Sequence, residues 1–181
     1  MKKEIILEII VVCGMLILSS IPIVDADKFQ PECKDKRNDS LRHWDILTGW
    51  FSEDHEQLYF TFKMHDLTPI GPATYSVLFS CGTTRYQVNA TIIAFGIPLF
   101  TLDRTDDFTQ RFQIKGYFDF EENIIHIKIP KNIDDKFCQP TTIDNILATS
   151  RFHLCELFQY YSIPYSLFCD KVYGDAYTLN T

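Results

Sequence analysis

The feature that most constrains the fold is a strict alternation of apolar and polar residues that recurs between positions 57 and 130. In the range 57–65, Leu58, Phe60, Phe62 and Met64 occupy every second position. Successive side chains of a β-strand point to opposite faces, so this period predicts half-buried antiparallel strands. The same pattern recurs in the ranges 74–81, 85–92, 111–120 and 123–130.

Short segments rich in turn-forming residues separate these strands, for example Cys81-Gly82 and Glu121-Glu122-Asn123. Residues 143–150 fit a short helix or a strand, and we expect a strand because the sheets need partners. The sequence therefore predicts an all-β fold, an antiparallel β-sandwich of jelly-roll or immunoglobulin-like type. In that fold Met64 fills the core, whereas His65 and His126 face outward.

The first 26 residues have the layout of a secretory signal. Lys2 and Lys3 precede an apolar run from Ile5 to Ile23, and Val24-Asp25-Ala26 supplies small residues where a signal peptidase cleaves. The run is also close to the roughly 20 residues that span a bilayer, so an uncleaved membrane anchor is the alternative. Either arrangement places the rest of the chain outside the cytoplasm, secreted or at the cell surface.

The mature part divides into a polar, charged N-terminal stretch and one domain. We expect residues 27–43 to form a flexible arm and residues 44–181 to form the sandwich. The whole chain has a net charge of −7 and no basic stripe, which argues against a nucleic-acid partner.

Cysteines and sequons fit an exported protein. Of the six cysteines, Cys13 lies in the signal and five remain, so at least one has no partner within the chain. The pair that we expect is Cys155 with Cys169, which closes a densely aromatic loop or hairpin over residues 154–169. Asn38 and Asn89 begin N-x-S/T sequons and are predicted glycosylation sites.

Four stretches resemble one family of secreted domains. They read D-I-x-x-x-W-F-S-E at 45–53, L-Y-F-T-F-K-M-x-D-L at 58–67, I-H-I-K-I-P-K-N-I at 125–133 and Y-G-D-A-Y-T-L at 173–179. In order and spacing they are similar to archaeal and bacterial surface β-sandwiches related to the DOMON and family-9 carbohydrate-binding-module group, with a departure at 154–169. The resemblance implies a sandwich in an extracytoplasmic setting, in a group that contains sugar binders and haem carriers.

Carbohydrate binding is the first functional hypothesis, because aromatic faces pack against the apolar side of sugar rings while amides and carboxylates bond the hydroxyls. Tyr59 and Tyr117 lie on predicted solvent faces. Trp44 and Trp50 are further candidates, although a core position for Trp50 is the simpler interpretation. The predicted ligand-binding residues are Tyr59, Tyr117, Tyr160, Tyr161 and Tyr165.

A structural or protein-interaction role is the alternative, with the aromatic segment 154–169 as the contact surface. Haem binding is a second alternative, because the DOMON-type haem proteins that the chain resembles use a methionine and a histidine as axial ligands. Met64 would pair with His126 or His153, but the strand periodicity turns Met64 inward and His126 outward.

Metal and catalytic sites have little support. The acidic clusters at 103–107 and 134–135 lack EF-hand spacing, and we interpret them as solvated turns rather than calcium sites. His43, His55 and His65 flank separate elements and do not make a convincing metal trio. There is no G-x-S-x-G, H-E-x-x-H or phosphate-binding loop. We therefore predict a non-enzymatic binding module without a cofactor or metal.

Overall fold

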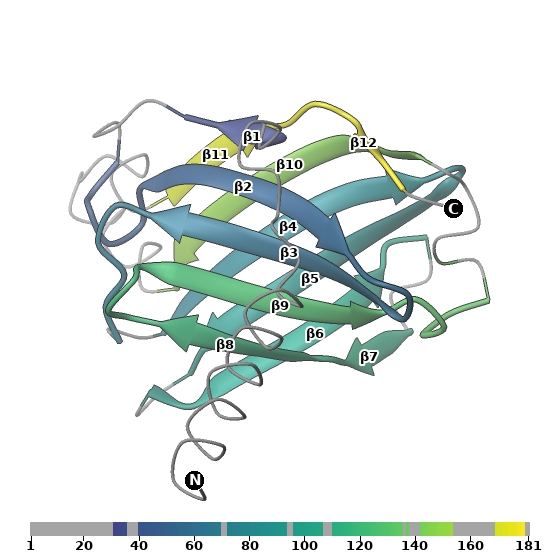
Figure 1. Cartoon of the computed structure of the whole chain (residues 1–181). Helices are drawn as coiled ribbons and strands as arrows, with labels where there is room; N and C mark the ends of the chain where they lie inside the picture. The colour runs from purple at the N-terminus through teal and green to yellow at the C-terminus, as the bar shows by residue number, and fades with distance from the viewer. Residues whose placement is uncertain are drawn as a thin grey trace, which may run out of the picture. The chain divides into compact units, whose positions relative to one another are not determined.

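Two antiparallel β-sheets make up the part of the chain that the computed structural model describes. The described residues are 31–35, 40–69, 72–93, 96–106, 110–135, 137, 142–153 and 169–179. A five-stranded sheet has the strand order β1-β2-β3-β9-β8, and a seven-stranded sheet has the order β11-β10-β4-β5-β6-β7 with β12 paired to β10. Figure 1 shows the five-stranded sheet in front of the seven-stranded one. The predicted antiparallel sandwich is confirmed.

The bounds of the strands are as follows. The five-stranded sheet consists of β1 (Cys33–Lys34), β2 (Ile46–Glu53), β3 (Gln57–Met64), β9 (Ile124–Pro130) and β8 (Lys115–Asp119). The seven-stranded sheet consists of β11 (Cys169–Tyr173), β10 (Thr142–Phe152), β4 (Ala73–Cys81), β5 (Thr84–Ile92), β6 (Pro98–Arg104), β7 (Arg111–Gln113) and β12 (Tyr177–Thr178).

The apolar positions of the alternating segments form one core between the sheets. Leu58, Phe60 and Phe62 of β3 are 0% exposed, and Met64 is 1% exposed. Each such side chain removed from water contributes about 1.5–3 kcal/mol to the hydrophobic term. The sequence periodicity therefore identified the inner face of the sandwich, including the core position of Met64.

The segment 111–120 differs from its prediction as a single strand. It forms β7 in the seven-stranded sheet and β8 in the five-stranded sheet, with Ile114 between them. The backbone N–H of Ile114 donates to the carbonyl of Phe100 at 3.1 Å, which holds the crossing against β6. Phe120, expected on the apolar face, lies in the following turn and is 40% exposed.

Part of the segment predicted as a flexible arm belongs to the sandwich. Cys33–Lys34 forms β1 at the edge of the five-stranded sheet, where Cys33 pairs with Gly49. Cys33 is 0% exposed and also makes an isolated bridge to Gly174. The strand was missed because two residues carry too little periodicity to register as an element.

Several strands start or finish at the same end of the sandwich, which we call the apolar end. Here β3 finishes beside the start of β9, and β10 finishes beside the start of β4 and of β11. The connection from β5 to β6 also lies at this end, because Ile92 pairs with Pro98 and Ala73 pairs with Ile92. In Figure 1 this end is on the left, where the arrow of β3 points.

Among the described residues, no helix is both long enough and apolar enough to cross a membrane.

Candidate functional site

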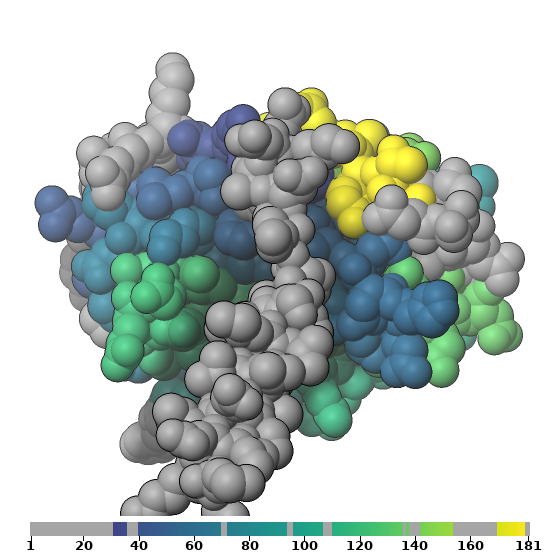
Figure 2. All heavy atoms as spheres, in the orientation of Figure 1, coloured from purple at the N-terminus to yellow at the C-terminus, as the bar shows by residue number. Residues whose placement is uncertain are grey.

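The outer face of the five-stranded sheet carries two neighbouring rows of side chains that cross four strands. Trp50, Thr61, His126 and Tyr117 pair in register across β2, β3, β9 and β8. Ser52, Tyr59, Lys128 and Lys115 form the adjacent row on the same strands. Paired residues in a sheet share a face, so these side chains lie opposite the core residues. Figure 2 is viewed from this side of the sandwich, with the visible parts of β8 and β9 in green.

Aromatic rings from three strands meet around His126. The ring of Tyr59 stacks on His126 with centroids 5.2 Å apart and an interplanar angle of 22°. The ring of Tyr117 lies on His126 at 5.2 Å and 39°. The hydroxyl of Thr61 is 2.9 Å from Nδ1 of His126 and fixes the imidazole between the two tyrosines. We call Trp50, Tyr59, His126 and Tyr117 the aromatic platform; Tyr117 is its most open member at 49% exposed.

A short turn holds Tyr59 in place. Its hydroxyl donates to Oδ2 of Asp54 at 2.6 Å, while Oδ1 of Asp54 accepts the backbone N–H groups of Glu56 and Gln57. This hydrogen bond lowers the pKa of Asp54 and raises the pKa of Tyr59. The ring of Tyr59 therefore has a fixed orientation on the sheet.

A glycine allows the neighbouring strand to carry Tyr117. A Cβ on Gly116 would lie 2.5 Å from the Phe100 ring and 2.7 Å from the backbone carbonyl of His126. The missing side chain lets β8 lie close to β6 at the crossing between the sheets. Gly116 thus sets the position of the exposed ring that follows it.

Burial changes the protonation of the histidine at the centre of the platform. Loss of solvent around His126 lowers its pKa, and the positive charge of Lys128 lowers it further. The imidazole is therefore neutral at neutral pH and presents an uncharged ring beside the tyrosines.

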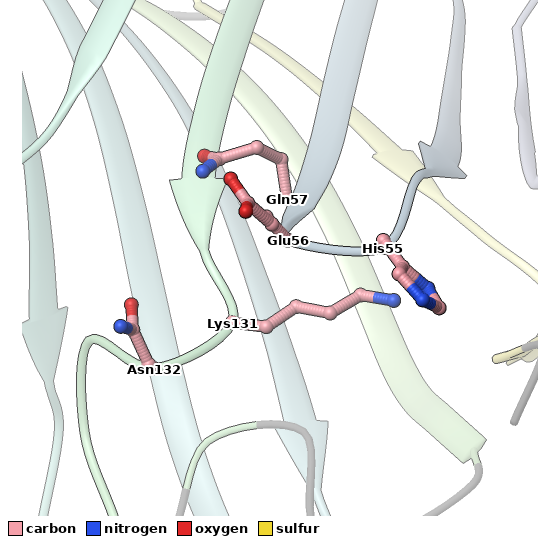
Figure 3. Close-up of a pocket in the computed structure, with 5 residues that line it drawn as sticks. All are labelled: His55, Glu56, Gln57, Lys131 and Asn132. Carbon is pink, nitrogen blue, oxygen red and sulfur yellow. The ribbon is translucent and has the colours of Figure 1, made fainter.

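A polar hollow adjoins the platform at the end where β2 turns into β3. It has a volume of about 500 Å³ and is lined by His55, Glu56, Gln57, Lys131 and Asn132. Figure 3 shows that these side chains come from the connection between β2 and β3, from the first residue of β3 and from the residues that follow β9. Gln57 precedes Tyr59 by two positions on β3, so the two side chains share the outer face.

The platform and the hollow together offer two kinds of contact. Exposed aromatic faces pack against apolar C–H surfaces, and the amides of Gln57 and Asn132 can donate and accept hydrogen bonds. Sugar rings present these same two surfaces, an apolar face and a rim of hydroxyls. Of the predicted ligand-binding residues, the structure brings Tyr59 and Tyr117 together, and Tyr160, Tyr161 and Tyr165 lie outside the described residues. The sequence did not indicate His126 as their meeting point, because only the strand register shows it.

The two tryptophans have different environments. Trp44 is 6% exposed and packs against Phe152 in the core, with centroids 5.0 Å apart. Trp50 is half-buried on the outer face, where it pairs with Thr61, so its interpretation as a core residue is wrong.

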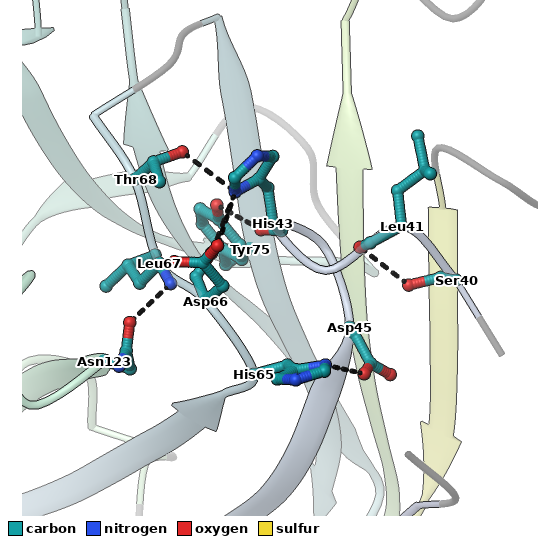
Figure 4. A network of polar contacts seen from close by, with 10 residues as sticks. All are labelled: Ser40, Leu41, His43, Asp45, His65, Asp66, Leu67, Thr68, Tyr75 and Asn123. Carbon is teal, nitrogen blue, oxygen red and sulfur yellow. Dashed lines mark hydrogen bonds and ion pairs between the residues drawn. The ribbon is translucent and has the colours of Figure 1, made fainter. Parts of the chain in front are cut away.

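The histidines that resembled a metal set belong to opposite ends of the sandwich. His43 and His65 lie at the apolar end, and Nδ1 of His65 is 2.9 Å from Oδ2 of Asp45 (Figure 4). The side chain of His65 is only 12% exposed, so the expectation that it faces solvent is wrong. His55 lines the hollow at the other end.

The candidate haem ligands Met64 and His126 lie on opposite faces of the five-stranded sheet. Met64 is 1% exposed in the core, and His126 is on the outer face of the same sheet. His153 bonds Thr74 on β4 with a distance of 2.6 Å between Nε2 and Oγ1. Met64 and His126 therefore point away from each other and do not converge on one iron.

The acidic clusters singled out in the sequence pair with basic residues. Asp103 accepts two bonds from Arg111, at 2.7 and 3.1 Å, and Asp134 lies 3.5 Å from Arg104. Asp107 lies outside the described residues.

Three other carboxylates, which the sequence did not indicate, come together near the start of β2. One oxygen from each of Asp35, Asp45 and Asp170 lies within 4.8 Å of the others. Calcium takes six to eight oxygen ligands, so this set is only a fraction of a calcium site. Asp170 accepts the backbone N–H of Ile46 at 2.7 Å, so the cluster ties β11 to β2.

The structure describes only some of the predicted modification sites. Asn89 is half-buried in β5, where its Nδ2 lies 3.1 Å from Oδ2 of Asp103; Asn38 lies outside the described residues. The side chains of Cys155 and Cys169 also lie outside them. Cys33 and Cys81 are buried thiols that form no disulfide with a described cysteine.

Comparisons with known proteins supply no further assignment. No protein-family model matches the chain, and neither a curated protein nor a solved structure is significantly similar to it. The resemblance to DOMON-like and carbohydrate-binding sandwiches therefore depends on the sequence stretches alone. What the structure establishes is the class of fold, an all-β domain of two antiparallel sheets.

Proposed function

We propose that the protein is an exported, non-enzymatic binding module that recognises carbohydrate on the outer face of its five-stranded sheet. The observation that carries this proposal is the convergence of Tyr59 and Tyr117 on His126, each with a ring-to-ring distance of 5.2 Å. The signal-like residues 1–26 support an extracytoplasmic location, where polysaccharides are abundant.

The exposure and the neighbours of the platform support this proposal. The strand face presents the rings on its outer surface, and the half-exposed Tyr117 leaves one aromatic surface open to a ligand. The neighbouring hollow adds amide and carboxylate groups for hydroxyls, from Gln57, Asn132 and Glu56.

The test is the binding of the full chain to a glycan array, comparing Tyr117→Ala with Tyr173→Ala. Tyr173 is 76% exposed on β11 of the other sheet, so it controls for the loss of an exposed tyrosine. Removal of an aromatic contact at the centre of a site costs more than about 1 kcal/mol, which corresponds to a loss of affinity of at least roughly fivefold. Equal binding by both variants and the wild type contradicts the proposal.

A second candidate function, protein–protein interaction, is favoured by the distribution of exposed apolar side chains. Five of them lie in segments at the apolar end. They are Leu41 at 40%, Ile93 at 40%, Ile97 at 56%, Leu99 at 40% and Phe120 at 40%. Exposed apolar groups that gather at one place are typical of protein contact sites.

The occupant that this second candidate requires is another protein of a surface assembly with an apolar contact patch. Ile97→Asp introduces a charge into the patch, and co-purification of that protein from the native envelope should be lost. Thr83→Asp, in an exposed turn between β4 and β5, is the matched control because it adds the same charge outside the patch. Unchanged co-purification by Ile97→Asp contradicts this candidate.

A further inference from the structure

Two lysines stand directly opposite each other beside the aromatic platform. Lys115 of β8 pairs with Lys128 of β9, and Lys128 also pairs with Tyr59 of β3. Both lysine side chains are exposed on the outer face. Like charges that face each other across strands destabilise a sheet, by about 0.2–1 kcal/mol. The pairing of Lys115 with Lys128 is therefore unfavourable. It places two positive charges side by side in a chain whose net charge is −7.

No carboxylate in the two rows offsets this charge. The row positions other than the lysines hold Trp50, Thr61, His126, Tyr117, Ser52 and Tyr59. Across the described part of the chain, neither Lys115 nor Lys128 makes an ion pair.

Two acidic side chains close in sequence to the two rows, Asp54 and Asp119, accept hydrogen bonds from other groups. Asp54 accepts the hydroxyl of Tyr59 and the backbone N–H groups of Glu56 and Gln57. Asp119 accepts the backbone N–H groups of Glu121 and Glu122. Lys131 is paired with Glu53, so it is not a third ammonium group available at this site.

We propose that the ligand is an acidic carbohydrate, whose sugar ring packs on Tyr117 and whose anionic group lies between the ammonium groups of Lys115 and Lys128. This inference depends on the proposed function, because it assigns a ligand class to the same platform. The register places Lys115 two positions before Tyr117 on β8, on the same face, and Lys128 two positions after His126 on β9. One ring and its charged substituent can thus contact both rows at once.

The anion can be a ring carboxylate, as in a uronic acid, or a sulfate ester. Both have oxygens that accept charge-assisted hydrogen bonds from an ammonium group. Binding should weaken as salt is added, because dissolved ions screen the attraction between exposed charges. The screening length is about 10 Å at 0.1 M ionic strength and shortens as salt increases. Contact between the ring and Tyr117 should be much less sensitive to salt.

The test compares the binding of the full chain to oligogalacturonate and to the same oligomer fully methyl-esterified, which keeps the sugar backbone and removes the charge. A sulfated galactan and its desulfated form distinguish the sulfate source. We expect wild type to prefer the charged form of at least one pair. K115Q/K128Q should weaken that binding about tenfold, since each exposed charge contact contributes up to about 1 kcal/mol. K171Q is the matched control, an exposed lysine on β11 of the other sheet.

The outcomes separate this inference from the function on which it depends. If Tyr117→Ala abolishes binding but charged and uncharged forms bind equally and K115Q/K128Q has no effect, carbohydrate binding stands and the acidic ligand is wrong. If none of the oligosaccharides binds, or if Tyr117→Ala does not weaken their binding, both the acidic ligand and the proposed carbohydrate binding are overturned. Circular dichroism and thermal unfolding of each variant show whether the fold is retained.

Discussion

At the scale of single residues, the platform depends on small groups that hold large rings. The carboxylate of Asp54 orients Tyr59, and the hydroxyl of Thr61 orients His126. Gly116 has no side chain, so β8 can approach Phe100 and place Tyr117 on the outer face. None of these three residues stands out in the sequence, because each role exists only relative to a neighbour on another strand.

Replacement of Gly116 by alanine should destabilise the domain. The added Cβ would lie 2.5 Å from the Phe100 ring and 2.7 Å from a backbone oxygen, so either the ring or the strand must move. Overpacking of this kind costs about 1–3 kcal/mol, measured as the free energy of unfolding in urea. Ser52→Ala on the exposed outer face is the control, with a change within about 0.5 kcal/mol. Equal stability of the two variants contradicts the close packing of β8.

The depressed pKa of His126 should make stability depend on pH. In the unfolded chain the imidazole has its ordinary pKa of 6.5, and in the folded protein the pKa is lower because of burial and Lys128. The unfolded state therefore binds more protons in the window between the two values, so this contribution is complete above pH 6.5 and lost as pH falls through the folded pKa.

The variant His126→Gln should lose that part of the pH dependence, as measured by urea unfolding at a series of pH values. His55→Gln is the control, because His55 is exposed in a turn. If the free energy of unfolding of His126→Gln depends on pH in the same way as that of the wild type, folding does not lower the pKa of His126.

At the scale of elements, the register between strands creates the site. A shift of one residue in β8 relative to β9 would turn Tyr117 and Lys115 toward the core. The register is set by the apolar alternation in both strands and by the turn at Asp119–Asn123, where Asn123 has a φ of 54°. The edge strand β1 contributes in another way, since it covers the free edge of β2.

Removal of residues 31–35 should destabilise the sandwich, although this stretch was expected to be an arm. Besides the pairing of β1 with β2, three hydrogen bonds are lost: Phe51 N–H to Glu32 at 2.7 Å, Asp35 N–H to the Leu47 carbonyl at 3.1 Å, and Asp175 N–H to the Glu32 carbonyl at 2.9 Å. At about 1 kcal/mol each, these three bonds alone account for about 3 kcal/mol, so the cost is at least that large. Thermal unfolding of chains that start at Pro31 and at Lys36 measures it, and equal midpoints would mean that β1 is dispensable.

The thiol of Cys33 should resist alkylation in the folded protein. It is 0% exposed, and burial, together with the charge of Glu32, raises its pKa to about 12. Only the thiolate reacts, so modification at neutral pH requires opening of β1. Site-resolved mass spectrometry after iodoacetamide treatment, with and without urea, checks this expectation. Modification at the same rate in both conditions would place Cys33 in an exposed segment.

At the scale of the whole molecule, the sequence was enough to predict the class of fold. It was enough to predict only part of the candidate site. The alternation in β3, β5 and β9 was long enough to identify a core face, and the alternation in β3 and in the segment 111–120 placed Tyr59 and Tyr117 outward. It could not show that these tyrosines meet at His126, because strand order and register depend on contacts distant in sequence. The division of 111–120 between two sheets was hidden for the same reason: both halves keep the two-residue period.

The two ends of the sandwich and its outer faces suggest a division of roles. The outer face of the five-stranded sheet combines rings, lysines and a polar hollow, whereas the apolar end gathers exposed aliphatic groups. The first arrangement suits a hydroxyl-rich ligand and the second suits a protein surface. A single chain can use both, with one surface for the ligand and the other for attachment to an assembly.

The most direct test of the central claim is a nuclear magnetic resonance titration of the isotope-labelled domain with oligogalacturonate and with its methyl-esterified form. The account predicts saturable amide shifts that are concentrated on β3, β8 and β9, around Tyr59, Tyr117 and His126, with larger shifts for the charged oligomer. Saturable shifts centred on the seven-stranded sheet or the β5–β6 connection would contradict a carbohydrate platform on the five-stranded sheet. So would the absence of saturable shifts with these oligomers and also with the sulfated galactan and its desulfated form.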